Sequence, residues 1–146
     1  MVKMNKKDLA LFCYPWDVID EGYDAIIDAV KRSGLNAIYI TVNYHSGMFF
    51  LPHSKKRKIY FPEPGALYIN PSSWHNNHSF QSPISNLTEN WSQFWEELSN
   101  QCKKNNIKLC AWMLGTHNSG IGNNYPNTSV YNAWGDPITH SLCPFN

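Results

Sequence analysis

Three short apolar runs limit most strongly what this chain can fold into. An amphipathic pattern joins the first two of them. Residues 9–14 and 37–42 are almost continuously apolar, which is typical of strands buried on both faces of a parallel sheet. Between them, apolar residues recur at helical spacing over positions 19–30. A strand, a helix and a strand in close succession predict a βαβ unit with parallel strands.

A second amphipathic pattern extends this alternation. Apolar residues at positions 91, 94, 95, 98 and 102 form one helical stripe, and residues 107–112 follow as a third predicted strand. Asn105 and Asn106 are expected to end this helix. For the first helix, we expect Asp17 or Asp20 to cap the N-terminus and Gly34 to terminate the C-terminus. The chain therefore belongs to the α/β class.

Two regions interrupt the alternation. Residues 45–86 are rich in proline and aromatic residues, and a connection of this length in a compact domain is usually functional when it is not disordered. Within this region we predict a hairpin between residues 58–61 and 66–69. Residues 115–135 are expected to be loop-like, with one helical turn after Pro126.

Bulk properties exclude several function classes. The net charge of +1 and the absence of a phosphate-binding glycine loop argue against a nucleic-acid or nucleotide partner. No segment has the ~18–20 apolar residues that span a bilayer, and we expect no membrane contact. The four cysteines lack paired spacing, so we interpret them as reduced thiols of a cytoplasmic protein. We interpret residues 55–58, a basic run, as a solvated loop, with a polyanion contact as the alternative.

The carboxyl ends of parallel strands are where α/β proteins bind ligands. A short cluster of residues follows the carboxyl end of each predicted strand. These clusters combine aromatic rings with polar groups that can hydrogen-bond to sugar hydroxyls. The candidate carbohydrate-binding residues are Trp16, Asp17, Tyr44, His45, His117 and Asn118. Trp16 is the favoured flat platform, whereas we expect Trp112 to point into the core. For each histidine alone, a purely structural role in its loop is equally plausible.

Carboxylates decide whether such a site hydrolyses glycosides, because that mechanism needs two of them. Asp17 is more typical of a helix cap, Asp136 of a turn, and Glu63 is only a weak candidate acid in a proline-flanked turn. No convincing pair emerges. A metal-dependent hydrolase using His75 and His78 is a weaker alternative, since no carboxylate lies near them in the sequence. We therefore predict neither a metal nor a cofactor.

A likeness to a known family is carried by the segments 12–17 (FCYPWD), 44–47 (YHSG), 51–53 (LPH), 60–65 (YFPEPG), 111–112 (AW), 117–119 (HNS), 132–136 (NAWGD) and 142–144 (LCP). With these segments the sequence resembles the start of uncharacterised bacterial glycoside-hydrolase-like barrel proteins. The resemblance implies that residues 1–146 form one partial domain, the N-terminal part of a (β/α)8 TIM-type barrel, with residues 45–86 as an insertion. Such families carry their acidic catalytic residues on the fourth and later strands, which lie beyond Asn146.

Together these observations favour a glycoside-hydrolase-like protein that binds a carbohydrate but lacks the catalytic carboxylates within these residues. A non-catalytic carbohydrate-binding or remnant module is the alternative from another class. An open three-stranded sheet would also be completed by self-association or by the missing C-terminal half of the barrel.

Overall fold

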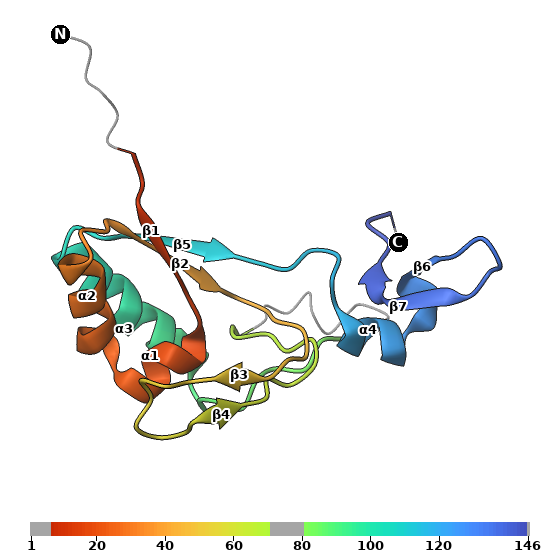
Figure 1. The fold of residues 1–146 in the computed structure, drawn as a ribbon, viewed down its shortest axis with the longest axis horizontal. Coiled ribbons are helices and arrows are strands. Elements are labelled where there is room, and N and C mark those ends of the chain that lie inside the picture. Colours follow the sequence, from red (N-terminus) through yellow and green to blue (C-terminus); the bar gives the residue numbers. More distant parts are fainter. Residues whose placement is uncertain (1–6, 71–80, 146) are drawn as a thin grey trace, which may run out of the picture.

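The computed structural model describes residues 7–70 and 81–145, and these form a mixed α/β protein with four α-helices and a parallel sheet (Figure 1). The parallel sheet contains β1 (Ala10–Cys13), β2 (Ala37–Thr41) and β5 (Lys108–Trp112) in the order β1-β2-β5. The helices are α1 (Pro15–Glu21), α2 (Tyr23–Arg32), α3 (Trp91–Lys104) and α4 (Ser119–Asn124).

Two small antiparallel hairpins complete the described structure. One pairs β3 (Phe49–Phe50) with β4 (Ile59–Tyr60), and the other pairs β6 (Ser129–Tyr131) with β7 (Pro137–Leu142). A 3₁₀ turn at Pro126–Thr128 precedes β6, so the helical turn predicted after Pro126 is confirmed. No described helix is long and apolar enough to cross a membrane.

The hydrophobic core lies between the parallel sheet and α2 and α3, which cover the same face (Figure 1). Ile38 and Ile40 of the central strand are fully buried, as are Val30 and Leu98 on the two helices. Each such side chain contributes roughly 1.5–3 kcal/mol when removed from water. The helical stripes found in the sequence are the faces that meet the sheet.

The helix ends follow from local sequence. After α2, Gly34 has a φ of 68°, its N–H bonds to the Lys31 carbonyl at 3.1 Å, and the Leu35 N–H bonds to the Val30 carbonyl at 3.0 Å. This pair of bonds is a Schellman motif, which requires a left-handed residue at that position. Asn106 (φ 55°) plays the same part after α3. Both predicted stops are confirmed.

The single helix predicted over residues 19–30 is wrong in one respect. Gly22 has a φ of 94°, which residues with a side chain rarely adopt, and the chain bends there into the separate helices α1 and α2. The amphipathic period did not reveal this break, because the apolar residues on both sides of Gly22 still face the core.

The hairpin predicted between residues 58–61 and 66–69 is also wrong. Residues 59–60 pair instead with Phe49 and Phe50. Residues 66–68 extend the end of β2: the Tyr68 N–H bonds to the Val42 carbonyl at 2.9 Å, and the Tyr44 N–H bonds to the Ala66 carbonyl at 3.1 Å. This arrangement buries Tyr68 completely, which a local two-strand hairpin would not.

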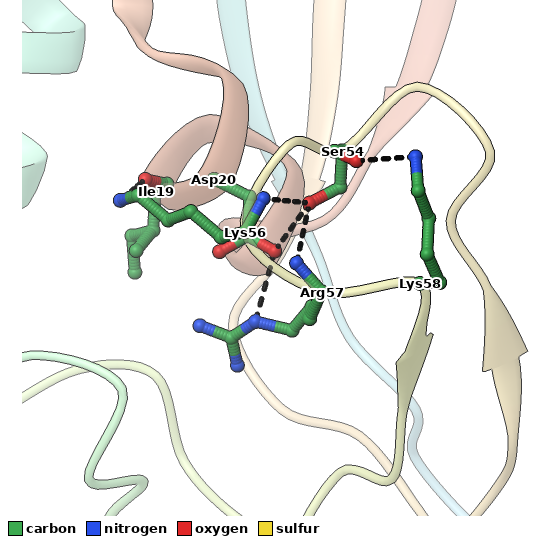
Figure 2. Close-up of polar contacts among 6 residues, drawn as sticks. All are labelled: Ile19, Asp20, Ser54, Lys56, Arg57 and Lys58. Atoms are coloured by element: carbon green, nitrogen blue, oxygen red, sulfur yellow. Dashed lines mark hydrogen bonds and ion pairs between the residues drawn. The ribbon is translucent and has the colours of Figure 1, made fainter.

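A basic loop fastens the β3–β4 hairpin to α1 (Figure 2). Asp20 of α1 is buried, and its Oδ2 accepts bonds from Arg57 Nε at 2.9 Å and from Ser54 Oγ at 3.0 Å. Lys56 Nζ bonds to the Ile19 carbonyl at 2.5 Å, supplying positive charge to the C-terminal end of a helix whose own last turn has none. The expectation of a simply solvated basic run is therefore wrong for Lys56 and Arg57.

The other face of the parallel sheet is not covered by these helices. Phe12 and Tyr39 are paired in register across β1 and β2, and their rings are in edge contact with centroids 5.5 Å apart. Phe12 is 63% exposed. Trp112 lies on this face against Phe12, at 5.9 Å, and not in the helix-covered core as predicted.

Candidate functional site

The ends of β2 and β5 are held side by side by one asparagine. The Asn43 side chain donates to the Leu114 carbonyl at 2.9 Å and accepts from the Leu114 N–H at 2.8 Å. An amide can make both bonds because it carries a donor and an acceptor. Asn43 thereby continues the parallel pairing beyond the strands, so the segments that begin at Tyr44 and Gly115 leave the sheet next to each other.

Three histidines gather beyond this link. The ring of His45 stacks on Tyr44, with centroids 4.5 Å apart, and contacts His117 edge-on, also at 4.5 Å. His140 follows at 5.8 Å from His117. His117 and His140 are exposed, and Tyr44 and His45 are half-buried. We call Tyr44, His45, His117 and His140 the histidine rim.

One ring nitrogen of His45 has a backbone partner. Its Nδ1 faces the Ser46 carbonyl, which only accepts, and this contact is made by the tautomer that carries its proton on Nδ1. In neutral imidazole this leaves Nε2 as an acceptor. Ser46 Oγ and Ser119 Oγ are 3.1 Å apart and add hydroxyl groups between the two strand ends. The rim therefore offers donors and acceptors beside an aromatic face.

His140 and Ser119 are residues that the sequence prediction missed. β7 is attached to the chain after β5 by two bonds, from the Leu142 N–H to the Thr116 carbonyl at 2.7 Å and from the Asn118 N–H to the His140 carbonyl at 3.2 Å. The sequence did hold a signal. Two short runs containing β-branched residues flank a turn that includes Gly135, which is typical of a hairpin.

Asn118 has a structural role in this structure. It is 4% exposed and is the N-cap of α4, where its Oδ1 accepts a bond from the Ile121 N–H at 3.1 Å. Its side chain also packs so closely against Gly65 that a Cβ there would lie 2.5 Å from Oδ1. Asparagine is among the most favourable N-caps, so a structural role accounts for this residue.

Trp16 is not the exposed platform that the sequence suggested. Its exposure is 0%. Its ring stacks on Tyr14 with centroids 4.4 Å apart and is covered by Phe49 and Tyr60 of the β3–β4 hairpin, each at 4.9 Å. The long loop folds back over the start of α1, and this non-local packing turns an apparent strand-end residue into a core residue.

Asp17 lies at the start of α1, where its Oδ2 accepts a bond from the Tyr14 N–H at 3.1 Å. This matches the helix-cap interpretation. Burial raises the pKa of the Asp17 carboxyl to about 6, against the lowering effect of that backbone bond. Asp17 does not belong to the histidine rim; it lines a separate cavity beside β1.

Glu63 is held by structural hydrogen bonds. Its Oε2 accepts from Tyr60 Oη at 3.2 Å and from Ser85 Oγ at 3.1 Å, and its Oε1 accepts from the Asn86 N–H at 3.4 Å. The carboxylate thus ties the proline-flanked turn to residues 85–86. Asp136 accepts a bond from Asn132 at 3.1 Å within the β6–β7 turn. The bonds described here give both residues structural roles within their turns.

Metal and thiol chemistry finds little support in the described ranges 7–70 and 81–145. They contain no group of three or more His, Cys, Asp or Glu side chains placed to hold a metal ion. His75 and His78 lie outside the described residues. The four cysteines are free, and burial raises the pKa of the Cys102 thiol to about 11, which makes it a poor nucleophile.

Comparison with known proteins gave no match: no family model fits the chain, and no curated protein and no solved structure is significantly similar to it. The functional argument therefore depends on the geometry of the described residues.

Proposed function

We propose that the protein binds a carbohydrate at the histidine rim, and that the described residues hold this ligand without cleaving it. The observation that supports the proposal most is the contact between the half-buried His45 and the exposed His117, which brings imidazoles from two neighbouring strand ends together with their ring centroids 4.5 Å apart. Strand carboxyl ends are the usual ligand sites of parallel α/β sheets. Imidazole and hydroxyl groups there match the hydroxyl edges of a sugar.

The absence of hydrolysis in this proposal rests on the carboxylates. Both oxygens of Glu63 and one oxygen of Asp136 accept structural hydrogen bonds, and Asp17 Oδ2 accepts a bond from the Tyr14 backbone N–H. A glycosidase needs one carboxyl group free to protonate the leaving oxygen and a second facing the sugar. These three residues do not supply that pair, so binding is the activity that the rim supports.

We also propose that the parallel sheet is of the (β/α)8 type suggested by the resemblance. Sequential parallel strands with helices on one face and aromatic rings on the other agree with this architecture, in which the second face becomes the packed interior of the barrel. A reading frame that continues with further strand–helix units would support the proposal. A stop codon immediately after Asn146 would contradict it.

The binding proposal is tested with a glycan array followed by calorimetry on any glycan retained. His117→Ala and His140→Ala remove exposed rim imidazoles, and His53→Ala is the matched control because His53 is an exposed histidine on another loop. Each lost hydrogen bond of about 1 kcal/mol corresponds to a roughly fivefold weaker Kd. We expect that loss for both rim variants and none for the control. Equal affinities for all three variants would overturn the proposal.

A further inference from the structure

A cavity of about 370 Å³ lies beside the outer edge of β1, apart from the histidine rim. Its walls are mostly apolar and come from Leu11 and Cys13 of β1, Ile26 and Ala29 of α2, and the segment that follows β3. Phe12 and Phe50 also line it and are 63% and 72% exposed, so the cavity opens to solvent. A volume near 300–1,000 Å³ with apolar walls is typical of small-molecule sites.

One polar group in this wall has unused hydrogen-bonding capacity. The Asp17 carboxylate uses Oδ2 for the Tyr14 N–H at 3.1 Å, with Cys13 Sγ at 4.0 Å, and no bond to Oδ1 is present in the described part of the chain. Asp17 is half-buried and lines the cavity, so its second oxygen is open to a ligand that enters there.

The charges and rings of the cavity favour a cation. Glu21 adds a second carboxylate to Asp17, whereas His53 is the lining residue that can become positive. Accessible aromatic rings, those of Phe12, Tyr14 and Phe50, line the same space, and an ammonium group gains from aromatic faces as well as from carboxylates. An anion would meet two negative groups in an apolar surrounding, where repulsion is poorly screened.

We propose that this cavity binds a small amphipathic amine, with its ammonium group at Asp17 and its apolar body against Leu11, Ile26 and Ala29. Among the described residues no lysine or arginine lines this cavity, so the amine supplies the positive charge beside this carboxylate.

Calorimetric titration with three probes of equal shape tests the proposal: 2-phenylethylamine, 2-phenylethanol and phenylacetate. At pH 7.5 we expect the amine to bind at least tenfold more tightly than the alcohol, and the carboxylate not at all. Asp17→Asn keeps the side-chain volume and removes the charge, and should weaken amine binding about tenfold or more. Asp28→Asn is the matched control, since Asp28 is an exposed carboxylate on α2 outside the cavity.

A second variant tests whether binding depends on the cavity itself as well as on the charge of Asp17. Ala29→Phe fills the cavity from α2 without altering charge and should abolish binding of every probe, with circular dichroism to verify the fold. Amine binding that survives both Asp17→Asn and Ala29→Phe would overturn the proposal, and so would equal affinity for the three probes. His117→Ala should leave amine binding unchanged, so this result is independent of the carbohydrate proposal.

Discussion

The ion pair between Asp20 and Arg57 gives the sharpest prediction about stability. The Asp20 side chain has no exposure, its Oδ1 has no hydrogen-bond partner within residues 7–70 and 81–145, and its Oδ2 depends on Arg57 and Ser54. Replacing Arg57 by Gln therefore leaves a buried carboxylate held by one hydroxyl. Loss of one partner from a fully buried pair costs about 3–5 kcal/mol. Because a third of the Arg57 side chain is exposed, we expect a loss of about 2–3 kcal/mol.

Urea unfolding of Arg57→Gln, Asp20→Asn and the double variant measures this coupling directly. With Asp20→Asn already present, Arg57→Gln should cost little, giving a coupling energy of about 2 kcal/mol. The corresponding fall in Tm for Arg57→Gln is roughly 5–10 °C. The matched control is Lys108→Gln, which breaks the exposed Lys108–Asp8 pair at 2.5 Å and should change stability little. An Arg57→Gln protein as stable as Lys108→Gln, or a coupling near zero, would refute the reasoning.

Two further predictions concern burial and close packing. The pKa of the Asp17 carboxyl lies above its ordinary value, so the folded protein holds that proton more tightly, and stability falls as pH rises from 3.8 to about 6. Asp17→Asn should remove this pH dependence and stabilise the protein at pH 7 by about 1–2 kcal/mol, measured by urea unfolding across this pH range. The same pH dependence of stability in both proteins would argue against a desolvated carboxyl. Gly122 allows α4 to touch β7, since a Cβ there would lie 1.9 Å from the Thr139 carbonyl oxygen. Gly122→Ala should destabilise the protein by at least about 2 kcal/mol, whereas Gly115→Ala, which meets no atom within 4 Å, should be tolerated; equal denaturation midpoints would contradict the packing.

The parallel sheet and its helices were predictable because they depend on local periodicity. The apolar runs at 9–14, 37–42 and 107–112 contain the three observed strands, and the left-handed residue Gly34 ended α2 as expected. The position of the break at Gly22 was not predictable, since its neighbours keep the same buried face. Periodicity thus identifies elements and core faces, but it does not show where a glycine changes the direction of the chain.

The candidate site was predictable only where the parallel sheet determines it. The rule that parallel strands end at one edge predicted the proximity of His45 and His117, and their rings do meet. The prediction of an exposed platform at Trp16 is wrong because the distant β3–β4 hairpin covers the ring. The capping role of Asn118 was not predicted because the sequence did not show that a helix begins there. His140 was missed because it depends on a hairpin joined to the sheet by only a few backbone bonds.

The central claim is that His45 and His117 form one carbohydrate-binding surface. Side-chain NMR of the six histidines during titration with a glycan identified by array screening tests it most directly. We predict that the ring signals of His45 and His117 shift together along one saturating curve, with His53 unchanged. Shifts confined to His53, or no shift of either rim histidine at saturation, would contradict the account.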